Sequence, residues 1–338
     1  MGADRYSRQV RFGPIGPEGQ ARLAAARVTL IGCGALGSTI ANLLARAGVG
    51  HLRIVDRDFV ELDNLQRQVL FDEEDVLSVL PKAVAAAEKL RRINASIEVE
   101  PIVEDVSHAN VETLIADADT VLDGTDNFET RFVLNDACVK RGKPWIYGGC
   151  VGSYGMVLPV LPGETACLRC WISEVPPPGS SPTCDTAGVL NSAVGVIASL
   201  QANEAFKILT AHREALVSGL TVIDVWANTH QVLTVPRSSE CASCGRRSFP
   251  SLEARESGVT TTLCGRNAVQ VTPPAGRLDL ADAERRLSGL GPVRRNDYLL
   301  KFRIDPCELT LFADGRAIVQ GTSDPAQARS LYAKYVGS

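Results

Sequence analysis

The chain has 338 residues, enough for roughly two domains with hydrophobic cores. With 45% hydrophobic and 22% charged residues, its composition is that of a globular protein in water. A net charge of −4 without a basic cluster argues against a nucleic-acid partner. The N-terminal residues contain no apolar run of the kind found in signal peptides. The longest apolar stretch, 189–209, carries polar side chains, which favours a buried helix over a membrane span. We expect a cytoplasmic protein whose ten cysteines serve metal or thiol chemistry.

The first regular elements predict a strand, a glycine turn and a helix. A helix is expected at 18–26, and 28–31 is an apolar, β-rich run that stops at a glycine, as a buried parallel strand does. The sequence Gly-Cys-Gly-Ala-Leu-Gly then matches G-x-G-x-x-G, and apolar residues at three- and four-residue spacing continue as a helix. Because Gly32, Gly34 and Gly37 have no side chains, backbone N–H groups at the helix start can approach a phosphate, which the helix dipole also favours.

The residues after the next strand narrow the kind of nucleotide chemistry. A strand at 51–55 delivers Asp56 at its carboxyl end, where a carboxylate can accept from ribose hydroxyls. A tight structural turn without a ligand is the alternative. Further along the chain than Asp56, Asn64 and Arg67 add an amide and a guanidinium. Nucleotidyl transfer needs such groups because negative charge builds on the α-phosphate and the departing pyrophosphate, whereas hydride transfer needs a nicotinamide pocket.

A second anion site is indicated at the start of the following helix. The acidic residues 72–80 predict a loop, after which Pro81 precedes Lys82 and a helix over 83–93. The proline fixes the backbone, the helix start leaves N–H groups free, and the lysine adds a mobile ammonium. An ordinary exposed lysine is the alternative.

An acidic turn follows the next pair of predicted strands, at 97–103 and 120–122. It contains Asp123 and Asp126, at the edge where open α/β sheets bind ligands. Capping of the next helix is a competing role for Asp126 or for Asn127, because one residue can serve only one role fully.

Two C-x-x-C pairs predict a structural metal site. Four thiolates form a closed tetrahedral set for zinc, with stabilisation on the order of 10 kcal/mol. The ligands are Cys167, Cys170, Cys241 and Cys244. Two redox motifs are the alternative, which is disfavoured because neither pair heads a thioredoxin-like βαβ unit.

Between the two pairs, a Pro/Gly/Ser-rich run at 176–188 predicts an extended loop on which the thiol of Cys184 is accessible. Further predicted elements are strands at 144–147, 155–161, 220–226 and 231–235 and a long helix at 191–209. Residues 251–257 predict a linker to a small α+β domain, so that the domains are 1–250 and 251–338. The smaller one is expected to hold strands at 268–272 and 297–304, a helix at 280–287, a hairpin around Asp314-Gly315 and a last helix. We assign no chemistry to it; carrier docking and dimer support are equal alternatives.

Three motifs join the glycine turn to form a recognisable set: Arg5-Tyr6-Ser7-Arg8-Gln9, Asn64-Leu65-Gln66-Arg67-Gln68 and Thr125-Asp126-Asn127. Over residues 4–249 the set resembles the ThiF/MoeB/HesA family, the adenylating enzymes of sulfur-carrier proteins and kin of ubiquitin-activating enzymes. The resemblance implies a Rossmann-like, mostly parallel sheet that continues into an antiparallel half, whose exposed face holds a ubiquitin-fold carrier protein.

The resemblance also implies an activity, namely ATP-dependent adenylylation of the C-terminal glycine carboxylate of a small carrier that ends in Gly-Gly. Gly32, Gly34 and Gly37 would hold the phosphates and Asp56 the ribose. Asn64, Arg67 and Lys82 would stabilise the transferred charge, and Asp126 would bind Mg²⁺. Arg8 would reach the ATP site of the partner subunit, which implies a homodimer.

Cys184 lies in the region where family members carry a loop over the carrier tail. In some members a cysteine there takes a persulfide or thioester link, and in others it is dispensable. An NAD(P)-dependent oxidoreductase and a non-catalytic zinc-stabilised binding protein stay open as alternatives. The pathway also stays open between thiamine, molybdopterin, another sulfur product and protein conjugation.

Overall fold

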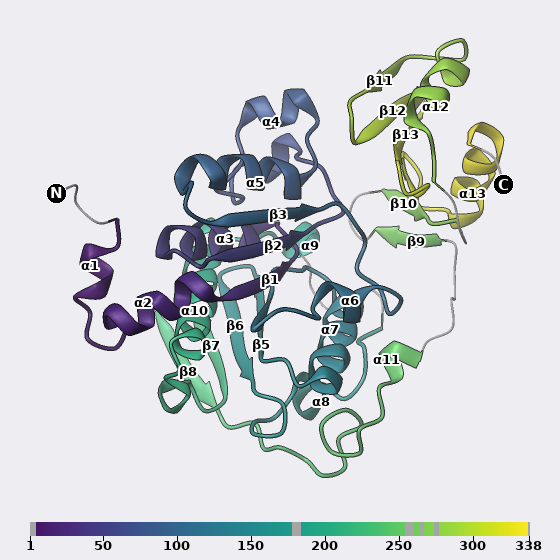
Figure 1. Cartoon of the computed structure of the whole chain (residues 1–338). Coiled ribbons are helices and arrows are strands. Elements are labelled where there is room, and N and C mark those ends of the chain that lie inside the picture. The colour runs from purple at the N-terminus through teal and green to yellow at the C-terminus, as the bar shows by residue number, and fades with distance from the viewer. Residues whose placement is uncertain (1–4, 178–183, 254–259, 264–266, 274–276, 337–338) are drawn as a thin grey trace. The chain divides into compact units, whose positions relative to one another are not determined.

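The computed structural model describes residues 5–177, 184–253, 260–263, 267–273 and 277–336 (Figure 1). The chain divides into two compact units, Met1–Ala254 and Arg255–Ser338, called unit 1 and unit 2 below. Within the described residues, none of the helices has both the length and the apolar character needed to cross a bilayer.

Unit 1 is built on an eight-stranded sheet whose order, within the described residues, is β3-β2-β1-β4-β5-β6-β7-β8. The strands from β3 to β5 pair in parallel, and the pairs from β5 to β8 are antiparallel. This confirms the predicted Rossmann-like sheet with an antiparallel continuation. The strands are β1 (Arg27–Ile31), β2 (His51–Val55), β3 (Glu98–Ile102), β4 (Thr120–Asp123), β5 (Trp145–Val151), β6 (Tyr154–Val160), β7 (Leu220–Asp224) and β8 (Thr229–Leu233).

Helices cover both faces of this sheet because neighbouring strand residues point to opposite sides. Leu30 and Leu122 share one core with α3, α5 and α10, whereas Ile31 and Val121 share a second core with α6, α7 and α8. The helices of unit 1 are α1 (Ser7–Val10), α2 (Gly16–Ala25), α3 (Ala35–Ala47), α4 (Glu73–Ser78), α5 (Lys82–Ile93), α6 (Val111–Leu114), α7 (Phe128–Arg141), α8 (Leu168–Trp171), α9 (Cys184–Ala187), α10 (Asn191–Leu209) and α11 (Pro250–Glu253).

The prediction of a loop at 72–80 is wrong, because the acidic residues there build the start of α4. Asp72 and Asp75 form a reciprocal capping box, in which each side chain accepts from the backbone N–H of the other. Further acidic residues in the first turn favour the positive end of the helix dipole. Lys89 of α5 lies 2.6 Å from the Asp75 carboxylate and fixes α4 against α5.

The predicted linker at 251–257 is also wrong in its first part. Ser251 belongs to α11, which packs against α7, and its backbone N–H donates to Asp136 at 3.0 Å. Residues 254–259 lie outside the described residues.

Unit 2 contains an antiparallel sheet with the order β11-β12-β13-β14-β10-β9. Helices α12 and α13 contribute to its core, together with Phe302 and Leu311. The predicted hairpin around Asp314-Gly315 is the β13–β14 connection, where Gly315 has a φ of +87°. The elements are β9 (Thr260–Leu263), β10 (Ala268–Val271), α12 (Leu280–Leu287), β11 (Val293–Arg295), β12 (Leu299–Ile304), β13 (Cys307–Phe312), β14 (Ala317–Gln320) and α13 (Pro325–Tyr335).

Candidate functional site

The structure explains the need for glycine differently at each of the three glycines of the predicted turn. A Cβ on Gly32, whose φ is +85°, would lie 2.7 Å from the carbonyl carbon of Gly124, and a Cβ on Gly37 would collide with the carbonyl oxygen of Gly32. Gly32 therefore lets the β1–α3 turn pack against the β4–α7 turn, and Gly37 lets the start of α3 pack closely on the backbone of its own turn. Around Gly34 the nearest heavy atoms to a Cβ are 3.9 and 4.0 Å away, so packing against the described residues gives no reason for this glycine. Close approach of a ligand to the backbone would supply such a reason.

This difference predicts opposite outcomes for two alanine substitutions. Gly37→Ala should prevent folding of unit 1, because the collision is with backbone. Gly34→Ala should fold and lose about 1 kcal/mol, the usual difference between glycine and alanine at a helix N-cap. Its affinity for ATP should nevertheless fall, because the methyl group occupies the approach to the helix start. Circular dichroism and ATP-dependent thermal shifts measure both effects; equal loss of folding in the two variants would contradict this interpretation.

Asp56 joins the glycine turn to the end of β2. Its Oδ2 accepts from the backbone N–H of Cys33 at 2.6 Å and its Oδ1 from that of Asp58 at 2.7 Å. Burial raises the pKa of Asp56, an effect that nearby Lys82 opposes. A carboxylate offers about four acceptor sites, so these two bonds leave capacity for ribose hydroxyls. Asp56 thus shapes the turn as well as being a candidate nucleotide ligand.

Lys82 is buried, so the alternative of an ordinary exposed lysine is wrong. The residue is 3% exposed, and its Nζ lies 3.6 Å from Oδ2 of Asp58. Its backbone N–H donates to the Asp58 carbonyl at 2.8 Å, which fixes the start of α5 beside the end of β2. The ammonium is therefore held in place near Asp56 and the glycine turn.

Asn64 and Arg67 lie on the irregular segment between β2 and α4. Asn64 closes the short 3₁₀ helix Leu62–Asn64 and is 1% exposed. Its Nδ2 donates to Asp63 at 2.7 Å, whereas its buried Oδ1 has no hydrogen-bond partner among the described residues. Arg67 is half-buried, and its Nη1 donates to the carbonyl oxygen of Asp63 at 2.7 Å.

The two aspartates of the acidic turn have separate roles. Asp123 is fully buried: its Oδ1 accepts from the backbone and hydroxyl of Thr125, and its Oδ2 accepts from Nε of Arg131 at 3.1 Å. Arg131 also donates to the carbonyl oxygens of Thr125 and Gly148. This arginine was not predicted as a site residue. It holds the turn that carries Asp126.

Asn127, not Asp126, caps α7. The Oδ1 of Asn127 accepts from the backbone N–H of Thr130 at 2.8 Å. Asp126 is exposed at the carboxyl end of β4 and is left available for a ligand. A carboxylate oxygen in this place fits a hard divalent cation.

Arg8 lies away from the glycine turn of its own chain. It is exposed on α1, and the neighbouring Tyr6 packs against Gly48, the C-cap of α3, where a Cβ would lie 2.5 Å from the tyrosine ring. The glycine turn is at the other end of α3, whose 13 residues span about 20 Å. The structure therefore brings the glycines, Asp56 and Lys82 together but does not bring Arg8 to them.

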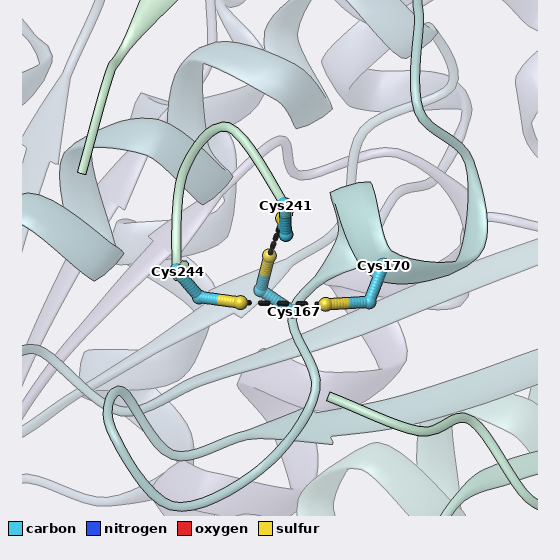
Figure 2. A group of neighbouring side chains, drawn as sticks. All are labelled: Cys167, Cys170, Cys241 and Cys244. Atoms are coloured by element: carbon cyan, nitrogen blue, oxygen red, sulfur yellow. Dashed lines mark hydrogen bonds between the residues drawn. The ribbon is translucent and has the colours of Figure 1, made fainter. Parts of the chain in front are cut away.

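The four cysteines of the two C-x-x-C pairs lie together (Figure 2). The Sγ–Sγ distances are 3.6 Å between Cys167 and Cys241 and 3.3 Å between Cys170 and Cys244, and all four sulfurs lie within 4.8 Å of one another. Four sulfurs at about 2.3 Å from one zinc ion would be about 3.8 Å apart, so the cluster fits a tetrahedral zinc site.

A buried carboxylate connects the two halves of this cluster. Asp136 on α7 accepts from Arg169, which lies between the first two cysteines, at 2.9 and 3.1 Å. It also accepts from the hydroxyl of Ser243, which lies between the second two. Asp136 was not predicted as a site residue; it orients both cysteine loops.

The remaining cysteines are buried, half-buried or outside the described residues. Burial raises the pKa of Cys33 and of Cys138 above their usual range, which makes both unreactive. Cys150 is half-buried. The backbone of Cys184 begins α9, which lies against β5, but its side chain and the preceding residues 178–183 lie outside the described residues. Its catalytic use stays a prediction.

Comparison with known proteins places this geometry in a family. Residues 6–244 match the ThiF family. The chain is 44% identical over 338 residues to the sulfur carrier protein ThiS adenylyltransferase of Bacillus subtilis, covering 98% of this chain and 99% of that protein. It is 39% identical over 247 residues to the sulfur carrier protein adenylyltransferase of Thermus thermophilus, covering 72% and 90%.

Among solved structures, E. coli MccB with MccA-N7isoASN is similar, with a TM-score of 0.64, 26% identity, and coverage of 72% of this chain and 75% of that chain. The family match spans more than half of the chain, and the Bacillus subtilis relative is similar from end to end. The chain belongs to the ThiF family.

Proposed function

We propose that this protein uses ATP to adenylylate the C-terminal carboxylate of a small ubiquitin-fold sulfur carrier that ends in Gly-Gly. The observation that carries the proposal is the meeting of three groups at the carboxyl ends of the adjacent strands β2, β1 and β4: Asp56, bonded to the glycine turn and close to the buried Lys82, the turn itself, and the exposed Asp126. The names of the two sulfur-carrier adenylyltransferases support the same reaction.

The chain offers a group for each part of the nucleotide. The N-terminal N–H groups of α3 and the backbone of Gly34, which carries no side chain, suit the phosphates, and the free lone pairs of Asp56 suit the ribose. Lys82 and Arg67 supply positive charge. The buried Oδ1 of Asn64 has no hydrogen-bond partner among the described residues and can accept from a donor on the ligand.

Asp126 would hold Mg²⁺, which neutralises phosphate charge when bound. The carrier carboxylate would attack the α-phosphorus while the bond from that phosphorus to the pyrophosphate oxygen breaks, giving an acyl-adenylate and pyrophosphate. The protein forms no covalent bond in this step. Its fixed cations and turns would orient the two reactants and stabilise the charge that moves to the leaving group.

The carrier body would dock on the antiparallel half of the sheet. Strand β8 is exposed along its length, with Val232 and Leu233 47% and 46% exposed, and Trp226 at the β7–β8 turn is 79% exposed. Apolar side chains of this kind support protein contact. Zinc would hold the four cysteines, Arg8 would act across a homodimer, and a later persulfide or thioester step would use Cys184.

Carrier-dependent exchange of pyrophosphate into ATP tests this proposal. The parent should exchange label only with a carrier that retains its last glycine. Arg67→Ala and Asp126→Ala should each lower kcat by about 100-fold, as loss of a charge-stabilising group does. Glu129→Ala, an exposed carboxylate on α7, is the matched control and should retain exchange. Parental rates in both site variants would contradict the mechanism, and thermal stabilisation by NAD(H) instead of ATP would favour an oxidoreductase.

A further inference from the structure

The side-chain amide of Gln201 lies at the point where strands β4 and β5 stop pairing. The paired residues of the two strands end at Leu122 and Ile146. One residue further along β4, the carbonyl oxygen of Asp123 accepts from Nε2 of Gln201 at 2.8 Å. The same nitrogen lies 3.4 Å from the carbonyl oxygen of Ile146. Gln201 belongs to α10 and is fully buried, so a helix side chain serves the backbone of both strands where their own ladder ends.

Strand β5 accommodates this amide with a glycine. A Cβ on Gly148 would lie 2.2 Å from Cδ and Oε1 of Gln201. The φ of Gly148 is not in the left-handed region, so the backbone conformation gives no reason for a glycine in this strand. The reason is the close approach of the amide.

A second side chain holds the same two strand residues from the other face of the sheet. Arg131 of α7 donates to the carboxylate of Asp123 at 3.1 Å and to the carbonyl oxygen of Gly148 at 3.1 Å. Helices α10 and α7 pack in the separate cores that lie on the two faces. Asp123 is therefore fixed through its backbone by Gln201 and through its side chain by Arg131. Three residues further along the chain, the turn carries Asp126.

Stability alone gives little reason for glutamine at this position. The buried Oε1 of Gln201 has no hydrogen-bond partner among the described residues, and an unpaired buried acceptor costs free energy. A methionine of the same length would remove that acceptor but would leave the Asp123 carbonyl oxygen without the amide donor. These two effects oppose each other, so the gain from the amide must be sought in what the bond to Asp123 places.

We infer that Gln201 is a positioning residue, which holds the end of β4 so that the following turn presents Asp126 to Mg²⁺. This inference rests on the proposed function, in which Asp126 binds the ion. The amide is bonded to the strand ends and acts on the ion only through the turn. A group that orients a metal ligand in this way typically changes metal affinity by about 10- to 100-fold.

The test compares the full-length parent with Gln201→Met. The variant should melt within about 3 °C of the parent without nucleotide, because the lost bond and the removed acceptor offset each other. Melting with ATP and EDTA and then with ATP and Mg²⁺ gives the stabilisation that depends on the ion, and this increment should shrink. In pyrophosphate exchange, the Mg²⁺ concentration for half-maximal rate should rise about 10-fold, while kcat at saturating Mg²⁺ stays within about threefold of the parent.

Asn203→Met is the matched control, since Asn203 lies on the same helix and is exposed. Its Mg²⁺ dependence should equal that of the parent. A Gln201→Met variant that does not fold, or that folds with the parental Mg²⁺ dependence, overturns the inference, because the amide then serves only the fold. Asp126→Ala separates this failure from that of the proposed function: if Asp126→Ala keeps the ion-dependent stabilisation of the parent, Asp126 is not the ligand and both fail. If Asp126→Ala loses it and Gln201→Met keeps it, the inference alone fails.

Discussion

Removal of metal from the four-cysteine cluster is expected to lower the melting temperature of unit 1 by about 10 °C or more. The cluster joins α8 to the turn that carries Cys241 and Cys244, a segment without helix or strand. Without a cation, four thiols at 3.3 to 4.8 Å must stay protonated or repel one another. Phe249 and Leu252, which pack in the same core, should then lose their places.

Chelation followed by differential scanning calorimetry measures this effect, and elemental analysis gives the zinc content. Cys241→Ser should lose zinc and melt as the chelated parent does. Cys150→Ala, a half-buried cysteine outside the cluster, is the control and should retain one zinc per chain. A parent that is purified without zinc and whose melting is indifferent to chelator would rule out a structural metal.

The α/β order of unit 1 could be predicted because its signals are local. The apolar strand before Gly32 and the helix after it show their periods within a few residues. The sequence over 72–80 carried an equally local signal, a capping box between Asp72 and Asp75, which the predicted loop overlooked. In unit 2, the edge strands β9 and β11 were missed because they are short and β11 ends in two arginines, without an apolar alternation.

The residues of the candidate site likewise divide into those that local sequence signals indicate and those whose role depends on tertiary contacts. The glycines, Asp56 and Lys82 stand at element ends, where the order of strands and helices places them together. Arg131 looked like any arginine within a helix, and its role depends on Asp123, Thr125 and Gly148 meeting around it. Asp136 likewise gains its role only when segments more than a hundred residues apart meet at one carboxylate. Such contacts arise from the packing of distant segments, so no residue spacing in the sequence predicts them.

Arg8→Ala is expected to lower pyrophosphate exchange by about 1,000-fold. Mixing it with the inactive variant Asp126→Ala should restore part of that activity. The reason is the position of α1. Tyr6 ties this helix to the C-terminal end of α3 through Gly48 and Asn94, about 20 Å from the glycine turn at the other end, which is beyond the reach of an arginine side chain. If Arg8 contributes to catalysis, it must do so in the site of a second copy.

Mixing Arg8→Ala with Asp126→Ala separates the two geometries. In a mixed dimer, the protomer that keeps Asp126 receives an intact Arg8 from its partner, so one of its two sites is complete. Random exchange of subunits should therefore restore about a quarter of the parental activity. If Arg8 acted within its own chain, each mixed site would lack one group and no activity would return. Arg11→Ala, at an exposed arginine next to α1, should keep full exchange, since removal of surface charge alone leaves the neighbouring site complete.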